Sequence, residues 1–236
     1  MNTLISALFS IAVLSTLLSV LSHFNWQVEA FVATIVGAVA NIIWVIMGVF
    51  LALSLDSVRK PQFELSVDES MHTDVRYQNG QRWKFYRIKV VNKSIPHWLR
   101  WIFPFTTRET AEQVQGVVVF KQLGRTMKGR WAYASELQYP NKTDYIHMSN
   151  FPEPVTIAAG QAEPLDLLVK YEHDSEAYGW NNESYLHDWK VPQYRLMTGD
   201  WEVYVQVTAL NGIAYGRSFM VHIAPSIEST YITAMN

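Results

Sequence analysis

Two long stretches near the N-terminus carry no charged residue. Met1–Gln27 and Ala30–Leu55 contain no Asp, Glu, Lys or Arg, and only Val28 and Glu29 separate them. A helix needs about 20 consecutive apolar residues to cross the hydrocarbon core of a bilayer. The first stretch also lacks the Lys or Arg that opens a signal peptide. We therefore predict a retained transmembrane hairpin in residues 1–56, with helices at about 3–22 and 30–55 and the lipid bilayer as a partner.

The second stretch carries small and polar residues at helical spacing. Gly37, Asn41 and Gly48 fall on one face of a helix, because they lie four and seven residues apart. Small residues let another helix approach closely, and an amide in hydrocarbon is stabilised by a hydrogen-bonding partner. These three residues are our candidates for helix–helix contact, whether within the hairpin, with a protein partner or in self-association.

Charges beside the hairpin indicate on which side of the membrane the rest of the chain lies. Arg59 and Lys60 follow the second stretch, whereas the link between the two stretches has no Lys or Arg. The positive-inside rule therefore predicts that both termini and the remainder of the chain are cytoplasmic. Three Asn-x-Ser/Thr sequons point the other way, because glycosylation acceptors lie outside the cytoplasm: Asn92, Asn141 and Asn182.

Residues 61–225 carry the alternating pattern of β-strands. Phe63, Leu65 and Val67 alternate with polar residues, which is typical of a half-buried strand. Asn79-Gly80 and Asn211-Gly212 favour turns between strands. Further strands are predicted at 83–91, 116–121, 130–137, 155–158, 165–171, 201–208 and 219–223, with an exposed turn at 124–130 and a C-terminal tail at 226–236.

This pattern predicts a membrane-anchored all-β protein. Short strands separated by turns, without an amphipathic soluble helix, favour an antiparallel immunoglobulin-like β-sandwich after the transmembrane hairpin. A closed β-barrel is the alternative. The intervals 92–115 and 172–200 are longer than ordinary hairpin loops, and long loops on a rigid sandwich commonly carry function.

The first long interval contains a short aromatic segment between two prolines. Trp98, Trp101 and Phe103 accompany Arg100, a cation between two Trp residues. Trp and Arg on one short element suit the membrane interface, where rings lie at headgroup depth and a guanidinium meets phosphate. The same composition suits a protein partner. A third interpretation is a loop that folds back over one end of the sandwich.

The second long interval mixes carboxylates with aromatic rings. Oxygen donors at Glu172, Asp174, Glu176 and Glu183 could gather a hard cation, and Trp180 beside amides could hold a sugar. The spacing matches no calcium loop and includes no His pair of the kind that binds zinc. The alternative is a solvated loop with some rings packed on the domain.

Several classes of function are disfavoured. The absence of cysteine excludes disulfides, thiolate metal sites and Cys nucleophiles. A formal net charge of −2 without a dense Lys/Arg face argues against a nucleic-acid binder. No phosphate loop, Gly-x-Ser-x-Gly elbow or His-Glu-x-x-His motif occurs. We therefore expect no catalytic residue, metal or cofactor.

The function predicted from these features is a membrane-tethered, non-enzymatic binding or scaffolding module of unknown ligand. One alternative is a membrane effector or channel-like assembly gated by ligand binding to the β domain, since the layout is similar to that of two-helix, β-rich effectors of prokaryotic defence. A second alternative resembles subunit II of the haem-copper oxidases. That resemblance implies a copper-free component of a redox complex, because the chain has no Cys for a dinuclear copper site.

Overall fold

A computed structural model of the chain describes residues 13–16, 26–76, 80–102, 106–133, 152–186 and 189–235. The chain divides into two compact units, Met1–Ser57 and Val58–Asn236. We call the second unit the β domain and describe each unit by itself.

The first unit is dominated by one long apolar helix, α2 (Trp26–Arg59). Its segment Ala30–Arg59 is long and apolar enough to cross a membrane by length and composition, as a signal sequence near an N-terminus also can be. Residues 13–16 are helical, and the rest of the first predicted helix lies outside the described residues. One candidate span is therefore shown where the sequence predicts two. Large exposed apolar side chains along α2 include Phe31, Ile42, Trp44, Phe50 and Leu53.

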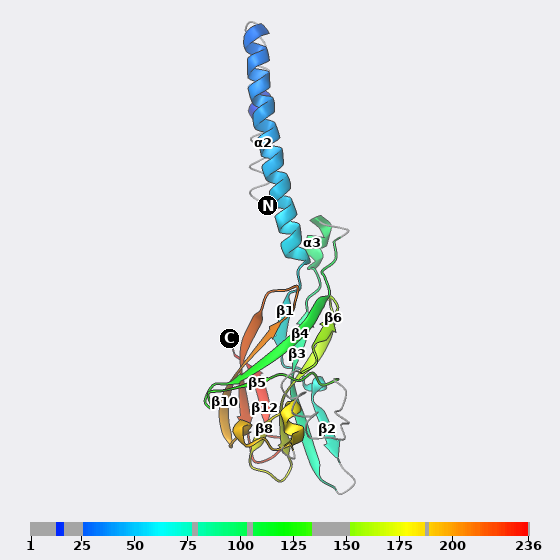
Figure 1. The fold of residues 1–236 in the computed structure, drawn as a ribbon, viewed down its shortest axis with the longest axis vertical. Helices are drawn as coiled ribbons and strands as arrows, with labels where there is room; N and C mark the ends of the chain where they lie inside the picture. The colour runs from blue at the N-terminus through cyan, green and yellow to red at the C-terminus, as the bar shows by residue number, and fades with distance from the viewer. Residues whose placement is uncertain are drawn as a thin grey trace. The chain divides into compact units, whose positions relative to one another are not determined.

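The β domain consists of two antiparallel sheets (Figure 1). In the described residues, the first sheet has the order β1 (Phe63–Ser66), β3 (Arg82–Asn92), β7 (Ala162–Tyr171), β8 (Ala177–Gly179) and β9 (Arg195–Leu196), with β2 (Thr73–Arg76) on β3. The second has the order β12 (Tyr231–Ala234), β11 (Tyr215–Ile223), β10 (Gly199–Thr208), β4 (Ala111–Phe120) and β5 (Arg125–Lys128), with β6 (Val155–Ile157) on β4. Short helical segments are α3 (His97–Ile102), η1 (Glu69–Met71), η2 (Asn182–Leu186) and η3 (Pro192–Tyr194).

The main hydrophobic core lies between the two sheets. Val203 of β10 lies opposite Phe219 of β11, and both are fully buried. Ile88 of β3 and Leu168 of β7 contribute to the same core from the other sheet. Because alternate residues of each strand face inward, the period-2 pattern of the sequence produces a sandwich-like pair of sheets. The sheets do not close into the barrel that was the alternative prediction.

Two segments differ from the sequence interpretation. The predicted turn at 124–130 contains strand β5, whose Met127 is fully buried. The segment 226–236 contains strand β12, which pairs with β11, so the sheet extends past residue 225. The strand predicted at 130–137 is represented by a single bridge between Trp131 and Leu165, and residues 134–137 lie outside the described ranges.

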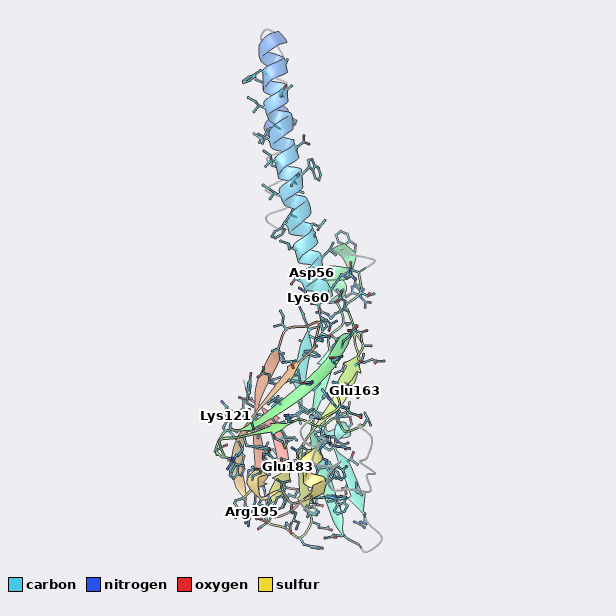
Figure 2. The ribbon with its side chains drawn as sticks, in the orientation of Figure 1. Asp56, Lys60, Lys121, Glu163, Glu183 and Arg195 are labelled. Carbon is cyan, nitrogen blue, oxygen red and sulfur yellow. The ribbon has the colours of Figure 1, made fainter. Side chains whose placement is uncertain are left out.

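The two ends of the β domain are distinct. Figure 2 shows Lys60 at one end and Arg195 and Glu183 toward the other. We call the first the tethered end, formed by 58–62, 92–102, 106–112 and 209–213, because the chain arrives there from α2. We call the other the distal end, which includes the start of β3 at Arg82, the loop residues 172–186 and 189, and the loop 224–230.

Candidate functional site

The tethered end is held together by the buried amide of Asn92. Its Nδ2 donates to the carbonyl oxygens of Glu109 and Ile157 at 3.0 Å each, and its Oδ1 accepts from the N–H of Gln62 at 3.3 Å. Its carbonyl oxygen accepts from the N–H of Gly160 at 2.6 Å. Asn92 therefore joins β3 to the segment that enters from α2, to the start of β4 and to β6.

The backbone immediately after α2 is fixed by a second set of contacts. The N–H of Glu109 donates to the carbonyl oxygen of Arg59 at 2.7 Å, and Nη1 of Arg108 donates to that of Lys60 at 2.8 Å. Burial lowers the pKa of Arg108, while a cation at a helix C-terminus is favoured by the helix dipole. The exposed ion pair between Arg59 and Glu109, at 3.5 Å, adds little.

Helix α3 carries the first candidate loop. Ile95, just before it, is buried, whereas Trp98 is 66% exposed and Trp101 is 88% exposed. The two rings lie three residues apart and so on one side of the helix. Arg100 is also exposed, and Phe103 lies outside the described residues. Trp98 and Trp101 therefore do not cap the sandwich core.

A second loop at the tethered end exposes apolar side chains that the sequence interpretation did not single out. Leu210 is 70% exposed and Ile213 is 75% exposed, in the turn between β10 and β11. The N–H of Leu210 donates to the carbonyl of Glu112 at 2.9 Å, and Nδ2 of Asn211 donates to that of Thr110 at 2.9 Å. The sequence feature that could have identified this loop is the pair of aliphatic residues flanking Asn211-Gly212, where polar turn residues are usual.

The second candidate loop does not gather its carboxylates around a common point. Each is paired separately: Glu172 with Arg82, Asp174 with Lys190, Glu176 with Arg195 and Tyr178, and Glu183 with Gln193. Among the described residues, no group of three or more His, Cys, Asp or Glu could hold a metal ion. These partners stabilise the loop, so the geometry favours a structural role for the carboxylates over a cation site.

Trp180 belongs to a second hydrophobic cluster, on the first sheet but apart from the main core. It is buried, and its ring lies 5.1 Å from that of Phe85 and 5.4 Å from that of Trp189. Trp83 of β3 lies 4.6 Å from Trp189 and 5.5 Å from Tyr171 of β7. We call this set the aromatic cluster. Because Trp180 is covered, it offers no open platform for a sugar, and the packed-loop alternative describes this segment better.

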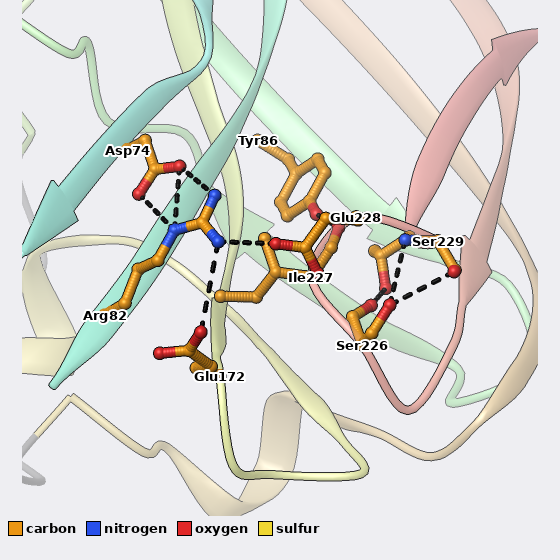
Figure 3. A network of polar contacts seen from close by, with 9 residues as sticks. Asp74, Arg82, Tyr86, Glu172, Ser226, Ile227, Glu228 and Ser229 are labelled. Atoms are coloured by element: carbon orange, nitrogen blue, oxygen red, sulfur yellow. Dashed lines mark hydrogen bonds and ion pairs between the residues drawn. The ribbon is translucent and has the colours of Figure 1, made fainter.

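Arg82 links three carboxylates at the distal end (Figure 3). Its Nε donates to Asp74 Oδ1 at 2.9 Å, its Nη1 pairs with Glu228, and its Nη1 lies 3.9 Å from Glu172. Asp74 lies in β2, Glu228 in the loop before β12, and Glu172 directly after β7. Arg82 therefore connects the distal loops through exposed contacts.

A buried ionic group lies on β7. Asp166 is bound by Arg87 at 2.8 Å and by Arg130 at 3.0 Å. Burial raises the pKa of Asp166, and the two guanidiniums act in the opposite direction. The guanidinium of Arg130 also lies 5.7 Å from the centre of the Tyr185 ring. This group ties β3 and the chain after β5 to β7 and was not anticipated from the sequence, because its members lie far apart in the chain.

The candidate helix-contact residues are exposed on α2. All three residues are exposed: Gly37, Asn41 and Gly48. A Cβ atom added at either glycine would meet no other atom within 4 Å. The less exposed positions of α2 fall on a different side of the helix: Val32, Val36, Ala40, Ile43 and Met47. The predicted stripe is therefore one continuous exposed face in the described structure.

Two of the three glycosylation sequons are buried. Asn92 is fully buried and its amide is occupied by hydrogen bonds, and Asn182 is 6% exposed. A glycan at Asn92 is incompatible with this fold. Asn141 lies outside the described residues. The sequons at Asn92 and Asn182 therefore give no support to a location outside the cytoplasm.

The comparisons with known proteins add no assignment. The sequence matches no protein-family model and no curated protein. Within the described residues, the geometry defines an antiparallel two-sheet domain that follows one candidate membrane span.

Proposed function

We propose that this chain is a membrane-tethered, non-enzymatic binding or scaffolding module. The observation that carries the proposal is the short connection between the apolar helix and the β domain. Strand β1 begins at Phe63, soon after α2 ends at Arg59, and the carbonyls of Arg59 and Lys60 are bound by Glu109 and Arg108. Such a connection keeps the β domain next to the bilayer.

The structure of the distal end supports a role in presenting a binding surface to a partner. Its loops are held by ion pairs around Arg82, Asp174 and Glu176 and by the aromatic cluster. Loops fixed in this way can offer a preformed surface with little ordering cost on binding. We also propose the finer assignment of the sandwich to the immunoglobulin-like type and a cytoplasmic β domain, which Arg59 and Lys60 favour by the positive-inside rule.

Sidedness and anchoring can be tested with one introduced cysteine, because the native chain has none. Ser175 is exposed in the distal loop, so Ser175→Cys provides a specific label. We expect the chain to stay in membranes after an alkaline wash. A membrane-impermeant maleimide should label Ser175→Cys only after the cells are permeabilised. Release by the wash overturns the tether, and labelling of intact cells overturns the cytoplasmic location.

The second candidate function is a membrane effector that assembles through its helices. The exposed face of Gly37, Asn41 and Gly48 is the observation that favours it. Replacing Asn41 and Gly37 together by Leu should weaken cross-linked species in native membranes, because the amide and the close approach are both lost. Val39→Leu, on the opposite side of α2, is the matched control. Unchanged cross-linking in the double variant contradicts assembly through this face.

A further inference from the structure

The tethered end combines exposed apolar side chains from two loops. Trp98 and Trp101 come from α3, and Leu210 and Ile213 come from the turn between β10 and β11. We call these four residues together with Arg100 the tethered-end surface. Monomeric soluble proteins rarely gather several large apolar side chains on one exposed end without a partner. The chemistry of the partner follows from the position of this end along the chain.

The length of α2 beyond its apolar part sets that position. Leu55 closes the uncharged stretch, and Arg59 lies four residues further along the same helix. Four helical residues rise about 6 Å, while the headgroup layer outside the hydrocarbon core is about 5–8 Å thick on each side. When the apolar stretch is inserted with Leu55 at the edge of the hydrocarbon core, the carbonyl of Arg59 lies within the headgroup layer.

The two loops are held near the residues that follow α2. Glu109 donates to Arg59 at 2.7 Å, and this segment follows α3 closely in the chain. The turn between β10 and β11 is bonded to Thr110 and Glu112. A Cβ atom added at Gly212 of that turn would lie 3.4 Å from Pro61, just after the helix. Both loops thus lie near residues 59–61, where the chain follows α2.

The side chains match a headgroup layer in kind. Trp rings favour the membrane interface, and aliphatic side chains partition toward the acyl chains. Arg100, between the two Trp residues, makes no ion pair within the part of the chain that the structure describes, and a guanidinium binds phosphate oxygens well. We propose that the tethered-end surface docks on the phospholipid headgroup layer of the bilayer that holds α2. This inference rests on the proposed membrane tether.

The test uses the full chain reconstituted in vesicles of phosphatidylcholine containing a minority of phosphatidylglycerol. Ile213→Cys and, as the matched control, Ser175→Cys at the distal end carry an environment-sensitive fluorophore. We expect lipids spin-labelled near the headgroup to quench the label at 213 several-fold more than the label at 175. Aqueous iodide should quench the two labels in the opposite order.

A second set of variants tests the contribution of the rings. Replacing Trp98 and Trp101 by Ser should lower the ratio of docked to undocked chains by about tenfold or more, because each ring contributes to the transfer equilibrium. The same pair replaced by Phe should retain docking. Met197→Ser, an exposed apolar residue next to β9 at the distal end, should change nothing.

The outcomes separate the two proposals. If the wild-type chain resists an alkaline wash but the labels at 213 and 175 respond equally to iodide and to spin-labelled lipid, docking is wrong and the tether stands. Lipid quenching at 213 that is insensitive to the Ser replacements also overturns docking through the rings. Release of the chain from the vesicles by the wash overturns the proposed tether itself.

Discussion

The two ends of the β domain place polar and apolar groups in opposite ways. At the tethered end the amide of Asn92 and the guanidinium of Arg108 are buried, while Trp98 and Trp101 are exposed. At the distal end Trp83, Tyr171 and Trp180 of the aromatic cluster are buried, and the ion pairs around Arg82 are exposed. Both ends are built from long intervals rich in Trp and charge, so composition alone does not decide which groups are covered.

The difference shows that a Trp ring is buried where it packs against side chains of a sheet and is exposed where it does not. Trp180 and Trp189 lie against Phe85 and Trp83, whose side chains stand on the sheet beneath them. Helix α3 instead follows Ile95, its buried neighbour, and leaves its rings uncovered. An exposed Trp is unfavourable in water and favourable at a membrane interface. The two ends are therefore suited to different surroundings, and the following substitutions test that comparison.

The largest effect is expected at Trp180. Trp180→Ala should lower the free energy of unfolding of the detergent-solubilised chain by about 3–5 kcal/mol, because it opens a cavity in the aromatic cluster. Trp101→Ala, which removes an equally large but exposed ring, should change it by no more than about 0.5 kcal/mol. Urea unfolding followed by near-UV circular dichroism measures both. A similar loss for the two variants would show that α3 packs as tightly as the distal loop.

The second prediction concerns the buried amide at the tethered end. Asn92→Ala should cost about 2–4 kcal/mol, because it leaves buried carbonyls and an N–H without partners. Asn211→Ala is the matched control. Its amide makes two comparable bonds, to Thr110 and Glu112, in a partly exposed turn, so water can replace them at a cost of about 1 kcal/mol or less. Equal unfolding midpoints for the two variants would contradict the buried role of Asn92.

The sandwich could be anticipated from the sequence because its strands alternate clearly. Trp201 to Thr208 and Phe219 to Ile223 were predicted as a pair around Asn211-Gly212, and the structure pairs β10 with β11. Gly80 of the predicted Asn79-Gly80 turn lies between β2 and β3 with φ +82°, while Asn79 lies outside the described residues. These features could be predicted from the sequence because a strand pattern and a turn each depend on residues that are close together in the chain.

The parts that were missed depend on contacts between distant residues. Strand β5 contains only one inward residue, Met127, between cations, so its pattern is too short to recognise. The burial of Trp180 depends on Trp83 and Phe85, which lie nearly a hundred positions earlier in the chain. The apolar turn at Leu210 and Ile213 belongs to the tethered end only through its bonds to residues 110 and 112.

A smaller effect is expected from His72, which lies between η1 and β2 with its ring 5.2 Å from that of Tyr86. Its Nδ1 accepts from the N–H of Arg87 at 3.2 Å, and burial with nearby Lys84 and Arg87 lowers the pKa of His72 to about 4. The unfolded chain then binds the proton more readily than the folded chain. The contribution of His72 to the free energy of unfolding is therefore fully present above about pH 6.5 and is lost as the pH falls toward 4.

We expect His72 to account for about 1–2 kcal/mol of that loss, after allowance for its partial exposure. His72→Asn keeps an oxygen acceptor for the N–H of Arg87 but cannot be protonated in this range. Its unfolding free energy should therefore depend less on pH between 4 and 6.5 than that of the unsubstituted chain. Parallel pH profiles for the two proteins would contradict a neutral, half-buried His72 and would assign the acid sensitivity to other groups.

The smallest effect is expected at the exposed contacts of the distal end. Glu228→Gln removes one ion pair from Arg82, which keeps Asp74. Exposed pairs are screened by salt and compete with water, so the unfolding midpoint should remain that of the unsubstituted chain at physiological ionic strength. Asp166→Asn, which removes the same kind of contact from a buried site, should lower the midpoint clearly, because it leaves the charges of Arg87 and Arg130 uncompensated. A comparable loss for Glu228→Gln would mean that the Arg82 contacts are shielded from water. The distal end would then bury polar groups as the tethered end does, and the contrast between the two ends would be wrong.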